Sequence, residues 1–440
     1  MQHSTQRLSA LAPRPATLAD LGLAQTLLAD LLAKHLAEAG ALDMAALGQR
    51  LGLSASLVEA LADWMRGDGR VEVLGMQGSS PFLRVGLTER GRRTAAEAFG
   101  RDGYVGPAPV PLADYRRVVS AQSGREAPLR RQRVHEAFAD TVIEPALLDR
   151  LGPAVNSGRA IFIYGPAGTG KSFIARRLSR LLGPPVLVPH AIAIGDSTVR
   201  CFDPAVHRPL QSAADASALL REGFDGRYVL CERPMVVAGG ELTQHMLDLG
   251  YDAANRLYQP PLQLRANNGL LLLDDLGRQR ISPTALFNRW IIPLEERQDH
   301  LTLKGGQQFI VPFDLVLVLS TNLDPLSLAD QAFLRRIGYK VPFAPATPQA
   351  YTAIYRQECE RSGIDFQPAQ VRFLIDQLHA RHRVDLLPCH PRDLLGLALD
   401  RARYLGEAGI DESALRWAWD NYFVTPAALD QSTAHTAHGR

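Results

Sequence analysis

The feature that most restricts the fold is a glycine-rich segment near the middle of the chain. It consists of Gly165, Pro166, Ala167, Gly168, Thr169, Gly170, Lys171 and Ser172. The short apolar, β-prone run Ile161–Tyr164 precedes it, and a segment with helical spacing, FIARRLSRLL, comes after it. A GxxxxGK[ST] loop between a strand and a helix turns its backbone N–H groups toward a phosphate at the positive end of the helix. The sequence therefore predicts a phosphate-binding loop in an α/β fold.

Two side chains of this loop are expected to have separate roles. Lys171 would reach the β- and γ-phosphate oxygens, and the Ser172 hydroxyl would ligate Mg²⁺. Lysine is otherwise rare in a chain that uses arginine almost everywhere, which indicates a site that needs a compact ammonium group. ATP and Mg²⁺ are the predicted cofactors.

A second strand, Leu270–Leu273, ends in the acids Asp274 and Asp275. Its unbroken apolar run is typical of a central parallel strand, and ligands bind at the carboxyl ends of such strands. We expect Asp274 to hold Mg²⁺ through water and Asp275 to polarise the attacking water. A solvated strand end is the plain alternative, but these acids end a run that reads as buried.

The loop, the acidic strand and the segments after them resemble the AAA+ ATPase superfamily over roughly residues 135–423. The resemblance implies an α/β P-loop NTPase core with a parallel sheet at 135–343 and a helical lid at 344–425. In that family the second acid is usually glutamate. Asp275 is one methylene shorter, as in the helicase-loader and transposition-helper branch.

Three later motifs extend the resemblance. Leu315–Ser320 and Asn322 are similar to the sensor-1 strand, whose amide sits between γ-phosphate and water. Arg335 and Arg336 resemble the arginine-finger segment, which acts on the nucleotide of a neighbouring subunit; Arg336 is narrowly favoured. Arg392 resembles the sensor-2 arginine of the lid. The alternatives are a turn asparagine, arginines paired within one subunit and a surface arginine.

Residues 18–100 read as a helix, a helix-turn-helix and a two-stranded wing, and resemble a winged-helix domain. Between Leu18 and Gly100 there are eight Lys/Arg against ten Asp/Glu, and the predicted recognition helix carries Glu59 and Asp63. Phosphates repel such acids, so docking to protein is favoured over contact with DNA. The basic residues of the wing side are Arg84, Arg90, Arg92 and Arg93. Residues 1–17 are predicted as a flexible leader, 101–134 as a Pro- and Arg-rich linker and 426–440 as a flexible tail.

Composition excludes few partners. The formal net charge of +2 creates no overall field that attracts nucleic acid or membranes. No apolar run approaches the ~18–20 residues that span a bilayer, so no membrane insertion is expected. The N-terminus lacks a secretion signal, so the chain is placed in the cytoplasm. The four cysteines form no CxxC pair; a site of Cys201, His207 and Cys231 is a weaker alternative to plain thiols.

The favoured hypothesis is an ATP-hydrolysing homo-oligomeric ring, expected as a hexamer, that remodels or translocates a protein client. A DNA-directed ATPase (loader, transposition helper or regulator) is the alternative, and a nucleotide-gated scaffold that barely hydrolyses is the third. The Val236–Gly240 segment and a helix after it are expected to face a central channel, against a lateral decoration of the subunit. A hairpin around Lys304 within 294–314 matches the layout of MoxR-like remodelling ATPases.

Overall fold

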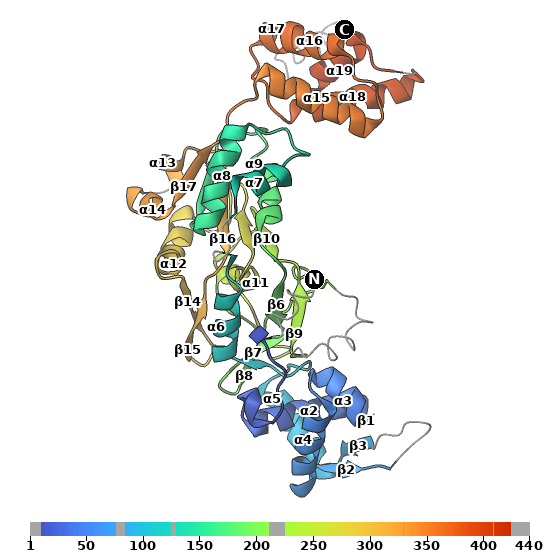
Figure 1. The fold of residues 1–440 in the computed structure, drawn as a ribbon, viewed down its shortest axis with the longest axis vertical. Helices are drawn as coiled ribbons and strands as arrows, with labels where there is room; N and C mark the ends of the chain where they lie inside the picture. The colour runs from blue at the N-terminus through green and yellow to red at the C-terminus, as the bar shows by residue number, and fades with distance from the viewer. Residues whose placement is uncertain are drawn as a thin grey trace, which may run out of the picture.

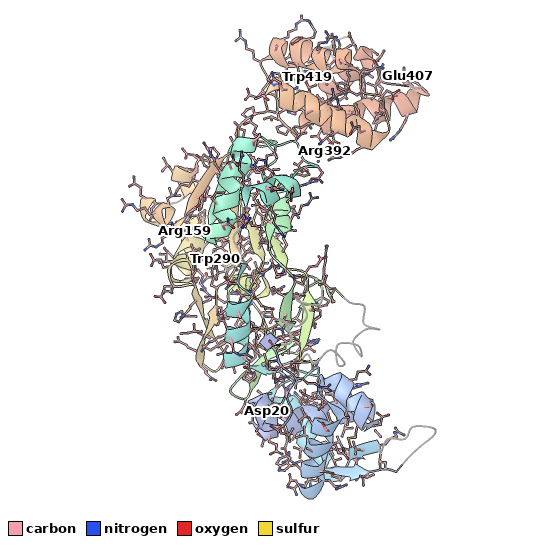
Figure 2. All side chains as sticks on the ribbon, viewed as in Figure 1. Asp20, Arg159, Trp290, Arg392, Glu407 and Trp419 are labelled. Atoms are coloured by element: carbon pink, nitrogen blue, oxygen red, sulfur yellow. The ribbon has the colours of Figure 1, made fainter. Side chains whose placement is uncertain are left out.

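The computed structural model describes residues 10–75, 84–124, 129–210, 225–328, 330–407 and 409–423. The molecule is elongated, with an N-terminal unit at one end, a central α/β part, and a group of C-terminal helices at the other end (Figure 1). Figure 2 shows Trp290 inside the central part and Trp419 among the C-terminal helices. It also places Arg392 on the side of those helices that faces the central part.

The central sheet has five parallel strands in the order β10-β13-β16-β5-β17. The strands are β5 (Ile161–Tyr164), β10 (Met235–Ala238), β13 (Leu270–Leu273), β16 (Val316–Thr321) and β17 (Tyr339–Pro342). Leu270 and Leu272 pack with helices α8 (Pro145–Ser157) and α9 (Lys171–Arg177) on one face, whereas Leu271 and Leu273 pack with α12 (Pro283–Glu296) on the other. Burial on both faces is why β13 is apolar at every position, and the predicted P-loop α/β fold class is confirmed.

A second sheet lies between the central sheet and the N-terminal unit, with the strand order β11-β12-β8-β7-β4. Its strands are β4 (Val110–Pro111), β7 (Ala191–Ile194), β8 (Ser197–Arg200), β11 (Gly250–Asp252) and β12 (Leu257–Gln259). Two antiparallel pairs accompany it: β6 (Val186–Pro189) with β9 (Tyr228–Cys231), and β14 (Gln298–Thr302) with β15 (Gln308–Pro312). The second pair is the hairpin predicted around Lys304.

The segment expected to face a channel is different in the structure. Val236 and Ala238 belong to β10, the edge strand that pairs in parallel with β13, and both are buried against its leucines. The helix expected after it is a single 3₁₀ turn at Gln244–Leu247, and the chain then enters β11. Because the first three residues of the Val236–Gly240 segment are sheet residues, this prediction is wrong for them.

The linker expected at 101–134 is largely ordered where it is described. It contains β4, α6 (Leu112–Ala121) and the start of α7 (Arg131–Ala137). Tyr115, Val118 and Val119 form one buried stripe of α6 in the same apolar cluster as the second sheet, and Arg116 donates to the Ile310 carbonyl of β15 at 2.6 Å. Three of the prolines that suggested a linker, Pro107, Pro109 and Pro111, stand before this helix, where they do not interrupt it.

The N-terminal unit, residues 18–101, packs its helices on a three-stranded antiparallel sheet with the order β1-β3-β2. Its elements are α2 (Gln25–Ala39), β1 (Ala41–Asp43), α3 (Met44–Leu51), α4 (Ala55–Gly67), β2 (Val71–Val73), β3 (Arg84–Leu87) and α5 (Glu89–Arg101). Side-chain caps from Asp43, Ser54 and Thr88 begin α3, α4 and α5, each accepting a backbone N–H bond.

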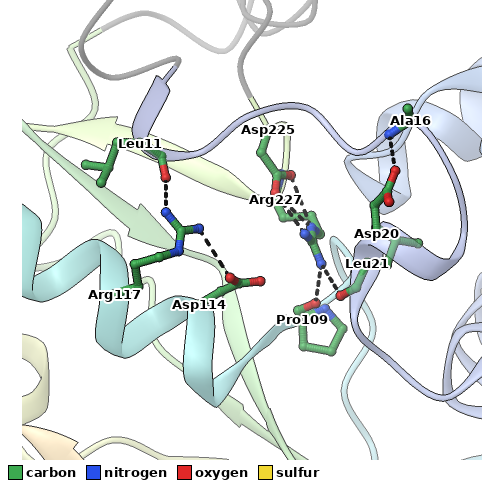
Figure 3. Close-up of polar contacts among 9 residues, drawn as sticks. All are labelled: Leu11, Ala16, Asp20, Leu21, Pro109, Asp114, Arg117, Asp225 and Arg227. Atoms are coloured by element: carbon green, nitrogen blue, oxygen red, sulfur yellow. Dashed lines mark hydrogen bonds and ion pairs between the residues drawn. The ribbon is translucent and has the colours of Figure 1, made fainter.

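The N-terminal unit is attached to the second sheet by a buried joint. Arg227 is 3% exposed and Asp225 4%, and their side chains form an ion pair at 2.9 Å. The Arg227 Nη1 atom also donates to the carbonyls of Leu21 and Pro109, at 3.3 and 3.2 Å (Figure 3). The Leu51 carbonyl accepts a further bond from the Ala108 N–H at 2.8 Å. These contacts make the connection a packed interface.

The C-terminal helical part has its own core, built around Tyr351, Tyr355 and Trp419. Its helices are α15 (Pro348–Ser362), α16 (Pro368–Arg372), the π-helical segment η6 (Phe373–His379), α17 (Ala380–His382), α18 (His390–Leu405) and α19 (Glu412–Tyr422). Three short helices complete the central part: α11 (Leu262–Arg265), α13 (Pro325–Leu328) and α14 (Gln331–Arg336). None of the helices in the described ranges has the length and apolar character to cross a membrane.

Candidate functional site

The glycine-rich loop leaves the end of β5 in a tight turn. Gly165, Gly168 and Gly170 have φ values of 140°, 81° and 86°, in the region that favours glycine. A Cβ atom on Gly165 would lie 2.1 Å from the Phe343 carbonyl oxygen, so no side chain fits there. Helix α9 then begins at Lys171. The local sequence thus produces the close backbone turn that phosphate-binding loops need.

The Lys171 ammonium lies across this turn. Its Nζ atom donates to the carbonyls of Gly165 and Pro166 at 2.8 and 2.7 Å. Burial lowers the pKa of Lys171, and the nearby carboxylates of Asp275 and Asp274 oppose that effect. The ammonium is therefore buried, and its acceptors are two backbone carbonyls that another acceptor could replace.

The structure brings the loop and the acidic strand together, although β16 lies between β5 and β13 in the sheet. The Ser172 hydroxyl donates to Asp274 Oδ1 at 2.8 Å. Asn322, just after β16, donates through Nδ2 to Asp275 Oδ1 at 3.1 Å. Asp275 is exposed and has a φ of 51°, which is uncommon for a residue with a side chain. Four of the predicted site residues thus form two side-chain pairs at one end of the sheet.

The C-terminal helices close the site from the opposite side. The Cys389 N–H donates to the Gly168 carbonyl at 3.2 Å, which joins the start of α18 to the loop. Arg392 lines the same cavity, of about 690 Å³, as the loop, Asp275 and Asn322. Its guanidinium pairs with Asp393 at 2.8 Å, and this hydrogen-bonded contact raises the pKa of Arg392.

Other residues that line this cavity belong to none of the motifs predicted from the sequence. Ile143 precedes α8, and Ile354 lies on α15; both are partly buried apolar side chains that line the cavity. No spacing in the sequence relates these positions to the glycine-rich loop, so motif reasoning missed them. Only the approach of α15 to the central part makes them neighbours.

The two arginines of α14 are outside this cavity and differ in their contacts. Arg336 Nε donates to Glu295 Oε1 of α12 at 2.6 Å, so Arg336 is held within its own chain. Arg335 is exposed, and within the described ranges its guanidinium has no hydrogen bond or ion pair. The structure therefore separates two residues that the sequence left almost equivalent.

The alternative site of Cys201, His207 and Cys231 is not formed. His207 accepts a bond from the Asp203 N–H at 2.9 Å through Nδ1, and its Nε2 atom is hydrogen-bonded to the Arg265 carbonyl at 3.0 Å. Both thiols are buried, and burial raises their pKa to about 12. Across the described ranges no group of three or more His, Cys, Asp or Glu side chains could hold a metal ion.

Comparisons with known proteins concern parts of the chain. The family model "Domain of unknown function (DUF8689)" matches residues 347–421. The vesicular-fusion protein Sec18 of Schizosaccharomyces pombe is 28% identical over 106 residues, which cover 22% of this chain. The match spans 13% of the length of Sec18.

The solved structures that match this chain are distant in sequence. The Holliday junction branch migration motor RuvB of Thermotoga maritima is 12% identical, with a TM-score of 0.38, over 64% of this chain and 70% of that chain. NtrX of Brucella abortus is 15% identical, with a TM-score of 0.38, over 72% and 61% of the two chains. Domain III of the T. maritima replication initiation protein DnaA is 15% identical, with a TM-score of 0.35, over 68% and 100%.

The strand order of the central sheet brings the predicted site segments to one end of the sheet. The phosphate-binding loop comes after β5, the two acids come after β13, and the amide of Asn322 comes after the intervening β16. The C-terminal helices then return to contact the loop at Gly168. This arrangement is that of a P-loop α/β fold with a helical part packed over the loop.

Proposed function

We propose that this protein binds ATP with Mg²⁺ in the cavity between the central sheet and the C-terminal helices and hydrolyses the nucleotide. The observation that carries this proposal is the contact of Ser172 with Asp274 at 2.8 Å, beside the Lys171 ammonium. Hydroxyl and carboxylate oxygens are the ligands that Mg²⁺ prefers, so the two side chains fit this ion. When bound, Mg²⁺ would supply charge neutralisation for the phosphate oxygens.

The chain's own groups have distinct tasks in this proposal. Lys171 exchanges the Gly165 and Pro166 carbonyls for β- and γ-phosphate oxygens, where its buried charge interacts strongly. Asp275 orients the attacking water, and Asn322 holds the Asp275 carboxylate through the 3.1 Å hydrogen bond. Arg392 leaves Asp393 and approaches the γ-phosphate when the C-terminal helices close on the nucleotide.

We propose further that hydrolysis requires a second copy of the chain, which supplies Arg335. The Arg335 guanidinium is exposed and lies outside the cavity of its own chain, so it is available to a neighbour. Arg336 is hydrogen-bonded to Glu295 and so attaches α14 to α12 of the same chain. A closed ring, proposed as a hexamer, gives every site one such neighbour.

The N-terminal unit favours a protein client over duplex DNA. Its order of helices and strands is that of a winged helix, but three of the four arginines on the wing side have acceptors within the unit. Arg84 donates to the Ala41 carbonyl at 2.9 Å, Arg90 pairs with Asp68 at 2.9 Å and Arg92 pairs with Glu89 at 3.2 Å. The exposed face of α4 presents Glu59 and Trp64, together with Asp63, which pairs with Arg66 at 3.0 Å. A surface with largely paired charges and an exposed indole suits a protein surface better than phosphates.

Three experiments test these proposals. Sedimentation with a non-hydrolysable ATP analogue and Mg²⁺ should show assembly, and a persistent monomer would contradict the ring. The ATPase rate should be insensitive to duplex DNA at two salt concentrations. Stimulation by DNA with a steep salt dependence would instead support the DNA-directed alternative. Turnover unchanged by Asp275→Asn would indicate a nucleotide-gated scaffold.

A further inference from the structure

A glutamine holds the turn that carries the two acids. The side-chain amide of Gln279 donates through Nε2 to the carbonyls of Asp274 and Asp275, at 2.8 and 3.0 Å. Its Oε1 atom accepts the Gly277 N–H at 2.7 Å. One carboxamide therefore binds three backbone groups of the turn, and Gln279 is not among the described residues that line the nucleotide cavity.

This turn needs support because its backbone is strained. Asp275 has a φ of 51°, a left-handed conformation that is uncommon for a residue with a Cβ atom. On the side of the sheet, the turn is anchored through Leu276: its N–H donates to the Ser320 carbonyl at 2.8 Å, and its carbonyl accepts the Thr321 hydroxyl at 2.7 Å. Gln279 provides the anchor on the other side.

We propose that Gln279 is a positioning residue for ATP hydrolysis. By binding the carbonyls of both acids, Gln279 keeps the Asp275 carboxylate beside Asn322, where it can orient water. The inference rests on the proposed ATPase activity and deepens it. The bonds of Gln279 go to the turn of the acids and not to Lys171 or Ser172, so it should affect turnover much more than nucleotide binding.

The chemistry of the carboxamide makes the idea specific. Glutamate has nearly the same shape and can still accept the Gly277 N–H, but an ionised carboxylate cannot donate to either carbonyl. It also brings a negative charge close to Asp275. The Gln279→Glu variant therefore changes the hydrogen bonds with little change in volume, and Gln279→Ala removes all of them. Arg280→Gln is a matched control on the same loop, because Arg280 is exposed.

The test compares kcat with the dissociation constant of a fluorescent ATP analogue in the full-length protein. We expect Gln279→Glu and Gln279→Ala to lower kcat by about 10²-fold, as small misplacements of a catalytic group do, with an analogue affinity within about threefold of wild type. Arg280→Gln should resemble wild type. In the Asp275→Asn background, adding Gln279→Glu should cause no further loss of kcat, because the carboxylate that Gln279 positions is already absent.

Three results would overturn the inference. These are wild-type kcat in Gln279→Glu, a parallel loss of analogue affinity, and losses that multiply in the double variant, which indicate a general structural role. Wild-type protein that binds the analogue but never turns over ATP would contradict the proposed function as well. Wild-type turnover with an unaffected Gln279→Glu variant contradicts this inference alone.

Discussion

Replacing Arg227 by alanine should loosen the attachment of the N-terminal unit to the second sheet. The variant removes every bond of the guanidinium and leaves the Asp225 carboxylate, which is 4% exposed, without its counter-ion. The carbonyls of Leu21 and Pro109 lose a donor at the same time. Removal of one partner from a buried ion pair typically costs about 3–5 kcal/mol. We expect a loss of this size in the free energy of local opening at the joint.

Hydrogen exchange measured by mass spectrometry can report this opening region by region. At about 1.4 kcal/mol for each factor of ten, a loss of about 3–5 kcal/mol corresponds to about 10²- to 10⁴-fold faster exchange in α2 and α3. Exchange in the strands of the central sheet should not change. Exchange of the backbone amides in α2, α3 and the central sheet can be measured without nucleotide, so the result does not depend on ATPase activity.

Figure 3 contains a matched control, the Arg117–Asp114 pair. Its side chains are 49% and 34% exposed, and exposed pairs contribute only about 0–1 kcal/mol. Arg117→Ala should therefore accelerate exchange in α2 and α3 by less than about tenfold. If Arg227→Ala behaves like Arg117→Ala, the joint is not held by the buried pair and the reasoning is refuted.

The remaining predictions concern the nucleotide site and the C-terminal helices. Lys171→Ala should abolish binding of a fluorescent ATP analogue, whereas retained binding would remove the central role of the loop. Arg335→Ala should keep analogue binding and lower kcat by about 10³-fold or more. Arg336→Ala should affect assembly and melting temperature more than the chemical step. If Arg336→Ala instead causes the larger loss of kcat, Arg336 is the residue that acts on the neighbour. Burial, with a smaller effect of His379, lowers the pKa of His390 from 6.5 to about 4. In the unfolded chain His390 binds a proton below about pH 6.5, whereas in the folded chain it does so only near pH 4. Because the unfolded chain binds the proton first, the free energy of unfolding falls by up to about 3 kcal/mol as the pH drops from 6.5 to 4. Melting curves at pH 7.5 and 5 should show this loss, and it should be smaller in His390→Phe; an equal loss in that variant would contradict the assignment.

Several features of the site could be predicted from the sequence because they depend on neighbouring residues. The left-handed turns of the phosphate-binding loop require glycine at particular positions, and the apolar run before Asp274 reports burial on both faces of the sheet. The hairpin around Lys304 arises from the same kind of local pattern. These local patterns can be recognised without knowing how the rest of the chain packs.

Other features depend on contacts between distant segments. The predicted channel segment Val236–Gly240 proved to contain a sheet strand, because β10 is placed by pairing with β13 rather than by its own composition. The proline-rich linker proved to contain α6, because the apolar cluster of the second sheet stabilises a helix there.

The sequence by itself determined that this chain has a glycine-rich loop between a strand and a helix, a carboxylate pair after a buried strand and a parallel α/β core. Only the tertiary structure decided which of Arg335 and Arg336 is held within its own chain, and that Gln279 holds the turn of the acids. Glu295 lies 41 residues from Arg336, and no local pattern encodes that pairing. Backbone preferences depend on adjacent residues and can therefore be recognised in the sequence. Hydrogen bonds between distant residues form only when packing brings their donors and acceptors together.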